Sequence, residues 1–235
     1  MSALMNWKSI VSEHKFVAAF SGGKDSVLAL YKAMKVGEAI GLIAMLEEEG
    51  KRSRSHGMPP ELLRAQADSI GLPLITAAAS WEDYETAFIR LLEKSKNKGA
   101  EVLVTGDLAV PSHGSWHEKV TKNAELKLGM PLWGMTHRAA VEAFVNLKFE
   151  SIIVTVNLSL GMREDDLGRT LNHEYLKELE TRGIDPCGEG GEFHTTVING
   201  PLFKYPISVR KGEIIKDGDY AFLPLELESV NHKRK

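Results

Sequence analysis

Short apolar runs alternate with amphipathic stretches through the first two thirds of the chain, and this alternation constrains the fold more than any other feature. Four runs are expected to form buried strands: KFVAAF (15–20), AIGLIAML (39–46), LPLITAAA (72–79) and EVLVTG (101–106). Helical patterns occupy the intervals at 25–36, 59–70, 82–98 and 114–128. Strands covered on both faces read as unbroken apolar runs, so the succession predicts an α/β domain with a parallel sheet.

The last third of the chain follows a different pattern. A helix at 137–147, a fifth strand at 151–158 and a helix at 170–183 are expected first. Alternating residues with an Asp-Gly turn signal at 217–218 then predict short strands. We therefore expect a smaller β-containing C-terminal domain, residues 133–235, after an N-terminal domain of residues 1–132.

The loop after the first expected strand reads SGGKDS, residues 21–26. In a parallel sheet this loop lies at the carboxyl edge, where ligands bind. Gly22 and Gly23 allow close backbone approach, and the N–H groups that open the next helix attract anions. Lys24 adds a mobile cation, Ser21 and Ser26 add hydroxyl groups, and the Asp25 carboxylate suits Mg²⁺. The loop therefore predicts a polyphosphate site.

Two other interpretations of this loop stay open from the residues alone. AFSGG is close to the G-x-S-x-G turn of serine hydrolases, with Ala19 in place of the first glycine. Asp107, His113 and His173 could then complete a triad, but none has a distinguishing context. Alternatively, the two glycines form a turn and Asp25 or Ser26 caps a helix. The loop does not match the Walker A pattern, because Asp25 follows Lys24 and Ala18 replaces the first glycine.

SGGKDS resembles the PP-loop of the N-type ATP pyrophosphatases. Three further blocks resemble the diphthine–ammonia ligase family of that superfamily: GDLAVPSHGSWHEKV (106–120), MPLWG (130–134) and DPCGEGGEFHTTVINGPLF (185–203). The blocks occur in matching order across nearly the whole chain. The resemblance implies a PP-loop ATP-binding domain, followed by a C-terminal domain that binds the second substrate.

The resemblance also implies the activity, which is ATP-dependent amide formation. A carboxylate attacks the α-phosphate of ATP, pyrophosphate leaves, and ammonia displaces AMP from the acyl-adenylate. In the ligase itself, the carboxylate belongs to diphthine, a modified histidine on elongation factor 2. The expected cofactors are ATP and Mg²⁺. A related ligase for another carboxylate, or an ATP sensor without turnover, are the alternatives.

Two polar clusters complete the expected site. Gly106 and Asp107 follow the fourth strand, and Asp107 could bind Mg²⁺ or a ribose hydroxyl or cap a turn. EGGEFH (189–194) could bind a metal or capture and deprotonate ammonium, or could be a plain hairpin turn. With the resemblance, the expected catalytic residues are Lys24, Asp25, Glu189, Glu192 and His194. Ser21 to Ser26, Gly106 and Asp107 would bind the nucleotide, and Asp25 and Asp107 the metal.

Several neighbouring features carry weaker signals. His113, His117 and Glu118 fit no known metal pattern and are expected on a helix face, in solvent or lining the cleft. Cys187 is expected to be passive. The four tryptophans lie too far apart in the sequence to form a stacking strip, although Trp116 and Trp133 are candidates to flank the site.

One segment differs from the family pattern. Family members from organisms that make diphthamide carry a tyrosine-containing segment after the second strand. Here EEEGKRSRSHGMPPELL (47–63) is basic and has no tyrosine. Arg52, Arg54 and His56 could bind an anionic substrate, or the segment could be a solvated loop.

Composition limits the classes of partner. The formal net charge of −3 argues against a nucleic-acid partner. The single cysteine excludes an internal disulfide and favours a reducing compartment. Apolar stretches fall short of the ~20 residues that span a bilayer. We expect a soluble cytoplasmic protein, whose C-terminal strands could pair across a homodimer.

Overall fold

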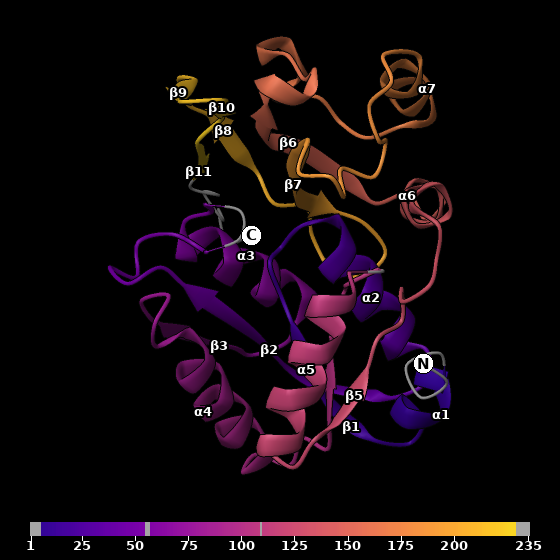
Figure 1. The fold of residues 1–235 in the computed structure, drawn as a ribbon, viewed down its shortest axis with the longest axis vertical. Coiled ribbons are helices and arrows are strands. Elements are labelled where there is room, and N and C mark those ends of the chain that lie inside the picture. The colour runs from indigo at the N-terminus through magenta and orange to yellow at the C-terminus, as the bar shows by residue number, and fades with distance from the viewer. Residues whose placement is uncertain (1–5, 55–56, 109, 229–235) are drawn as a thin grey trace, which may run out of the picture.

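The computed structural model describes residues 6–54, 57–108 and 110–228. Its N-terminal part contains a parallel sheet with the strand order β3-β2-β1-β4-β5 (Figure 1). The strands are β1 (Lys15–Ala19), β2 (Glu38–Leu46), β3 (Leu74–Ala78), β4 (Val102–Val104) and β5 (Lys127–Gly129). The expected α/β domain is confirmed. The order reverses direction between β1 and β4, which is where open parallel sheets bind ligands.

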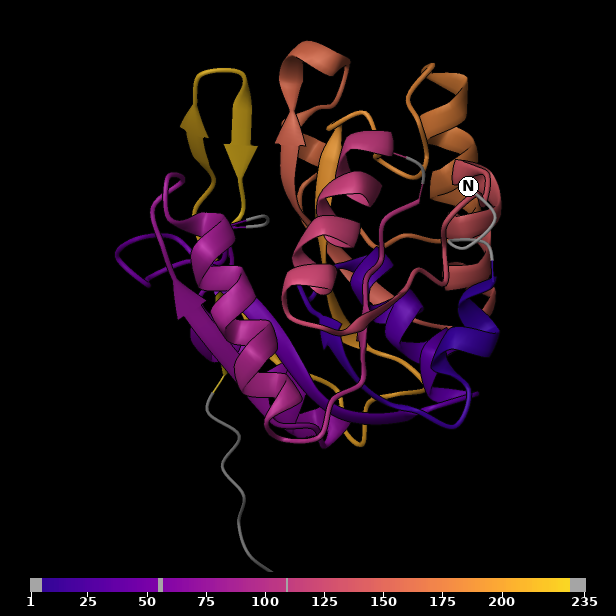
Figure 2. The ribbon, with the colours of Figure 1, turned by 60° about the horizontal axis from the view of Figure 1, so that its bottom comes forward.

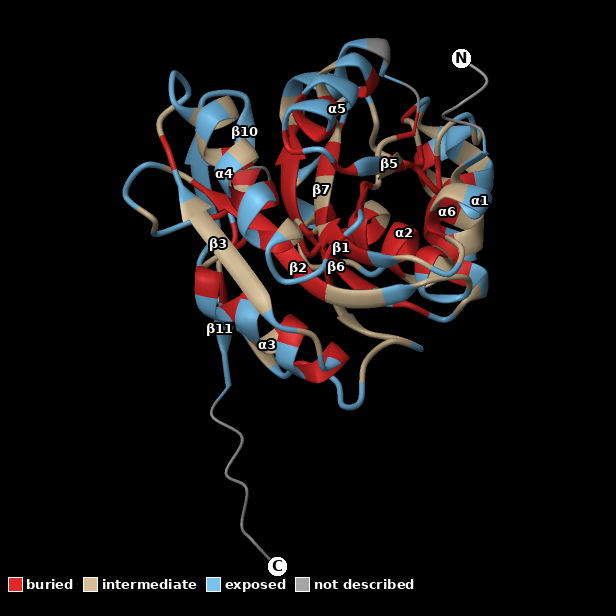
Figure 3. Ribbon diagram, turned by 90° about the horizontal axis from the view of Figure 1, so that it is seen from below, coloured by how far each residue is buried: buried red, intermediate tan, exposed pale blue. Residues whose placement is uncertain are grey.

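Helices cover both faces of this sheet. Successive residues of a strand point to opposite faces, so Phe16 and Ala18 enter one apolar core, and Val17 enters another. The first core includes residues of α2 (Lys24–Met34) and α3 (Pro60–Ile70); the second includes residues of α4 (Tyr84–Lys96) and α5 (Pro111–Asn123). Figure 2 shows α4 and α5 side by side, and Figure 3 shows that the central strands β1 and β2 are mostly buried, whereas β3 at the edge of the sheet is half-buried. The short helix α1 (Trp7–Val11) lies beside β5.

The expected helix at 114–128 is partly wrong. Helix α5 ends at Asn123, and residues 127–129 form β5, which pairs with β4 at the edge of the sheet. Glu125 adopts a left-handed φ of 52° between the two elements and reverses the chain. The β5 segment, KLG, has only one large apolar side chain and therefore shows no apolar run, unlike the VLV of β4.

The C-terminal part contains an antiparallel sheet with the order β7-β6-β10-β9. The strands are β6 (Glu150–Asn157), β7 (Phe193–Asn199), β9 (Ile215–Asp217) and β10 (Tyr220–Phe222). Strands β8 (Val209–Lys211) and β11 (Leu225–Leu227) form a separate pair. The helices of this part are α6 (His137–Asn146) and α7 (His173–Thr181), and two 3-10 turns are η2 (Leu158–Leu160) and η3 (Glu164–Asp166). The strand expected at 151–158 thus belongs to this second sheet.

Helix α2 lies where the two parts meet. One side of α2 packs on the parallel sheet, and α6 and β7 pack against it from the C-terminal part. One continuous apolar core therefore runs through both parts, from Phe16 and Leu63 to Phe144 and Leu176. No helix among the described residues is long and apolar enough to cross a membrane.

Candidate functional site

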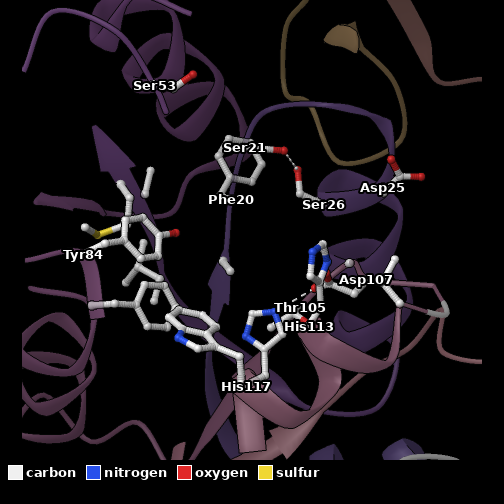
Figure 4. A pocket seen from close by; sticks show the side chains of 18 of the residues that line it. Phe20, Ser21, Asp25, Ser26, Ser53, Tyr84, Thr105, Asp107, His113 and His117 are labelled. Carbon is white, nitrogen blue, oxygen red and sulfur yellow. Dashed lines mark hydrogen bonds and ion pairs between the residues drawn. The ribbon is translucent and has the colours of Figure 1, made fainter. Parts of the chain in front are cut away.

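SGGKDS follows β1, as expected: Ser21, Gly22 and Gly23 form the connection, and Lys24, Asp25 and Ser26 form the first turn of α2. Gly22 has a φ of +76°, a conformation that favours glycine, and Gly23 is the N-cap of α2. The Ser21 hydroxyl donates to Ser26 Oγ at 3.1 Å, and the Ser26 hydroxyl donates to the Gly23 carbonyl at 3.0 Å. Both serine side chains line the same cavity (Figure 4). The loop thus presents hydroxyl groups and a helix N-terminus to one space.

Lys24 is held in place, whereas a mobile cation was expected. Its side chain is buried, and Nζ lies 2.6 Å from Asp25 Oδ2 and 3.7 Å from Glu189 Oε1. Burial alone would lower the pKa of Lys24, but the negative charges of Asp25 and Glu189 raise it above its ordinary value. The ammonium group therefore stays charged and joins two motifs that lie far apart in the sequence.

The two carboxylates beside Lys24 also form a candidate cation site. Ligand atoms of Asp25, Glu189 and Cys187 lie within 4.8 Å of one another. Burial raises the pKa of the Cys187 thiol to about 12, so Cys187 stays protonated at neutral pH and is a poor ligand. Burial and the nearby Asp25 charge also raise the pKa of Glu189. Two carboxylates are an oxygen donor set that suits Mg²⁺.

Asp107 is bound by two histidines of α5. Its Oδ1 lies 2.9 Å from His113 Nδ1, and its Oδ2 lies 2.9 Å from His117 Nε2. Burial would raise the pKa of Asp107, but the hydrogen bonds from His117 and His113 lower it to about 2. An ionised carboxylate only accepts, so both imidazoles donate to it. Figure 4 shows both rings beside Asp107.

Asp107 and both histidines lie in the wall of the cavity. The structure places both carboxylate oxygens of Asp107 in hydrogen bonds to imidazoles, and its role as a metal ligand stays a prediction. His113 and His117 line the cavity, which was one of the two placements expected for them. Gly106, just before Asp107, is needed for close approach: a Cβ there would lie 2.7 Å from the carbonyl carbon of Asp25.

The cavity has a volume of about 600 Å³ and opens at the carboxyl ends of β1, β2 and β4. This size is typical of small-molecule sites, which span roughly 300–1,000 Å³. Ser21, Asp25 and Ser26 form one side of the cavity, and Glu189 reaches it from the C-terminal part. Asp107 and the two histidines line another side. The cavity thus brings together residues of three sequence blocks: SGGKDS, the block that begins at Gly106, and EGGEFH.

Aromatic rings cover the remaining wall. Tyr84 lies between Trp81 and Trp116, with ring centroids 5.8 and 5.7 Å away, and Phe88 lies 5.0 Å from Trp116. All four rings line the cavity. The expectation that the tryptophans are too far apart was therefore wrong for Trp81 and Trp116, because α4 and α5 pack side by side. The aromatic spacing of Tyr84 and Phe88 on one helix face was a signal that could have indicated this wall.

EGGEFH contributes one residue to the cavity. Glu189 lines the cavity, whereas Glu192 and His194 do not. Glu192 folds over Gly190, where a Cβ would lie 2.7 Å from the Oε1 atom of Glu192. Its buried Oε2 has no hydrogen-bond partner within the described part of the chain. His194 lies in β7 opposite Thr155. Burial and the charge of Lys24 lower the pKa of His194 to about 4, so its imidazole is neutral at pH 7.

The basic segment after β2 is partly attached to the aromatic wall. The Arg54 guanidinium lies 4.3 Å from the centre of the Trp81 ring and donates to the carbonyl of Ala79. Arg52 is exposed and lies 3.3 Å from Glu47. His56 lies outside the described residues. Arg54 is therefore fixed beside the cavity wall, while Arg52 belongs to the solvated surface.

Comparisons with known proteins agree with the order of the motifs. Residues 14–128 match the family described as Diphthamide synthase N-terminal domain, and residues 137–230 match Diphthamide synthase C-terminal domain. A Diphthine--ammonia ligase of Mus musculus is 27% identical over 237 residues, which cover 90% of this chain and 88% of the relative. The Homo sapiens protein of that name is 25% identical with the same coverage. The Schizosaccharomyces pombe protein of that name is 26% identical, with 39% of its length matched.

Proposed function

The chain belongs to the diphthamide synthase family, and on this premise we propose that it is an ATP-dependent amide-forming ligase. In the proposed reaction, a carboxylate attacks the α-phosphate of ATP, pyrophosphate leaves, and the AMP group stays on the carboxylate as an acyl-adenylate. Ammonia then attacks the acyl-adenylate and releases AMP. The amide nitrogen comes from ammonia, and the energy of the mixed anhydride drives the bond formation.

The observation that carries this proposal is the cluster of Lys24, Asp25 and Glu189. It joins the phosphate-binding loop to EGGEFH on the wall of one cavity, with Nζ of Lys24 between the two carboxylates. A serine hydrolase needs a histidine within hydrogen-bond reach of Ser21. Ser21 instead donates to Ser26, and His113 and His117 are bound to Asp107.

Each group in the cavity has a proposed task. The backbone N–H groups of the Ser21–Ser26 loop, both serine hydroxyls and Lys24 would bind the β- and γ-phosphates and stabilise the leaving pyrophosphate. Asp25 and Glu189 would hold Mg²⁺, which supplies positive charge to the phosphates. Asp107 stays a candidate for the ribose or the metal. The aromatic wall offers flat apolar faces on which the adenine base can stack.

The second half of the reaction belongs to the EGGEFH side of the cavity. Glu189 carries the carboxylate that could attract ammonium from solvent. Glu192 and His194 stay proposed catalytic residues. Neither lines the cavity, so both would have to act through the residues that do. The acceptor carboxylate must reach the α-phosphate while the cavity keeps water from the mixed anhydride.

The relatives are named for diphthine and ammonia, and diphthine on elongation factor 2 is the acceptor we propose. One observation favours a second candidate, a related ligase that acts on another carboxylate. Arg54, from the basic segment that differs from the family pattern, is fixed on Trp81 at the rim of the cavity. Its guanidinium could select an acceptor with additional negative charge. In both cases we propose a cytoplasmic enzyme, and a homodimer stays a prediction.

The reaction can be tested with α-³²P-labelled ATP, Mg²⁺ and ammonium, with and without diphthine-containing elongation factor 2. We expect labelled AMP, and amide formation that depends on the acceptor. Labelled ADP would contradict the proposed cleavage, and tight ATP binding without any product would favour the sensor. Asp25→Ala and Ser26→Ala should each lower turnover about a hundredfold or more. Asp68→Ala, which removes an exposed carboxylate of α3, is the matched control and should leave turnover unchanged.

A further inference from the structure

The peptide unit between Gly22 and Gly23 is anchored from outside the loop. The Gly22 carbonyl accepts hydrogen bonds from Val197 N at 2.9 Å and from Gln66 Nε2 at 3.0 Å. Gln66 Nε2 also donates to the Val197 carbonyl at 2.7 Å. One fully buried amide thus uses both of its N–H groups to join α3, the phosphate-binding loop and strand β7.

The orientation of this carbonyl determines where the next N–H group points. A trans peptide is planar, and its C=O and N–H bonds point in opposite directions. Because the Gly22 carbonyl faces Gln66 and Val197, the Gly23 N–H faces away from them. On that side it lies 3.4 Å from Ser21 Oγ, which is a long hydrogen bond to a side chain of the cavity wall. The Gly23 N–H is therefore a weakly used donor on the ligand side.

A Gly-Gly peptide needs such an anchor. Glycine adopts left-handed and right-handed conformations with similar ease, so the peptide plane between two glycines can rotate at little cost. A rotated peptide would turn the Gly22 carbonyl oxygen toward the bound phosphates, and the two negative groups would repel each other. The anchor is itself costly, because Gln66 Oε1 is buried without a hydrogen-bond partner among the residues that the structure describes.

We propose that Gln66 is a positioning residue that fixes the Gly22–Gly23 peptide, so that the Gly23 N–H donates to a phosphate oxygen of the bound nucleotide. This inference rests on the proposed ATP site and deepens it. Gln66 does not line the cavity and acts through Gly22. Strand β7 supports the same loop a second time, since Thr195 Oγ1 accepts from Lys24 N at 3.1 Å. The C-terminal part thereby sets the geometry of the phosphate site.

The test compares ATP with adenosine in binding to the full chain, measured by calorimetry in the presence of Mg²⁺. Gln66→Met keeps the volume and removes both donors. We expect the Kd for ATP to rise about tenfold, as for the loss of one hydrogen bond to a charged group, and the Kd for adenosine to stay unchanged. Unchanged ATP affinity, or an equal loss for both ligands, would overturn the proposal.

Ser69→Ala is the matched control. Ser69 is a fully buried polar residue of α3 that also binds the C-terminal part, since its hydroxyl donates to the Tyr205 carbonyl at 2.5 Å. It does not touch the loop, so its removal should lower stability without changing either Kd. If ATP binding weakens as much in Ser69→Ala as in Gln66→Met, the contact between α3 and the C-terminal part explains the effect and the proposed role of Gln66 is wrong.

A second variant keeps the test decisive if Gln66→Met fails to fold. Gln66→Glu preserves the shape but brings at most one donor to the two carbonyl groups. ATP affinity should again fall by about tenfold while adenosine affinity stays constant. Failure of the proposed function would look different. The wild-type protein would then form no AMP, although its affinity for ATP would still fall when Gln66 is replaced. A wild-type protein that binds no ATP would contradict both proposals.

Discussion

His194 shows how burial at a single residue sets a chemical state. Its imidazole lies in β7, and burial together with the charge of Lys24 lowers its pKa to about 4. Between that value and the ordinary histidine pKa of about 6.5, the unfolded chain binds a proton that the folded chain does not. The free energy of unfolding must therefore fall as the pH falls through this window.

We expect His194 to contribute about 1–3 kcal/mol to this loss of stability between pH 7 and pH 4.5. His194→Gln removes the titrating group, so urea denaturation should show a weaker dependence of the free energy of unfolding on pH. His173→Gln, which changes an exposed histidine of α7, should keep the wild-type dependence. A pH dependence that is identical in wild type and His194→Gln would show that His194 is protonated equally in both states.

At the scale of elements, the N-terminus of α2 is held by segments on several sides. The loop after β4 touches it at Gly106, and strand β7 binds it through Val197 and Thr195. At Gly106, where the contact is closest, there is no room for a side chain larger than hydrogen. The elements around the SGGKDS segment therefore form a close-packed frame, and we expect this frame to hold the N–H and hydroxyl donors in place before a ligand binds.

Gly106→Ala should distort this frame. The new Cβ would lie 2.7 Å from the Asp25 carbonyl carbon and 2.9 Å from Ser26 N, and backbone atoms cannot move aside cheaply. We expect a loss of about 1–3 kcal/mol in the free energy of unfolding and a clear loss of ATP affinity in calorimetry. Gly212→Ala is the control, because the new Cβ would approach no atom more closely than the Cβ of Pro224, at 3.3 Å. Wild-type ATP affinity in Gly106→Ala would argue against the frame.

At the scale of the whole molecule, the two parts share one apolar core. Residues 1–132 and 133–235 are predicted as two domains, yet buried side chains of both belong to a single continuous cluster. Hydrogen bonds from Val197 to Gly22 and from Ser69 to Tyr205 also cross between the parts. A shared core of this kind favours cooperative unfolding of the entire chain.

We expect Leu176→Ala to reveal this cooperativity. Leu176 is fully buried in α7, and its truncation should cost about 2–5 kcal/mol. Three of the four tryptophans lie within residues 1–132, and the ring of Trp133 lies against Gly114 of α5, so tryptophan fluorescence reports mainly on the N-terminal part. If the parts unfold together, the fluorescence melting temperature falls as much as the one measured by far-ultraviolet circular dichroism. A fluorescence transition that stays at the wild-type temperature would mean that the two parts unfold independently.

The local patterns of the sequence are sufficient to predict the parallel sheet, most helices and the position of the SGGKDS segment after β1. These features depend on local pattern: unbroken apolar runs, helical stripes ended by glycine, and a Gly-Gly turn after the first strand. The resemblance carried by SGGKDS and EGGEFH also indicated the family, which the comparisons bear out. Strand β5 was not predicted, because KLG contains a single large apolar residue and so lacks the apolar run that marked β4.

The contacts between side chains that lie far apart in the sequence depend on how the elements pack. Glu189 reaches Lys24 across 165 positions, His113 and His117 bind Asp107, and Gln66 fixes the Gly22 carbonyl. The packing of α4 beside α5 likewise gathers the aromatic wall. Sequence periodicity reports which face of an element is apolar, but it does not report which element lies against that face. The site depends on that second kind of information, because its groups act through distances of a few ångströms.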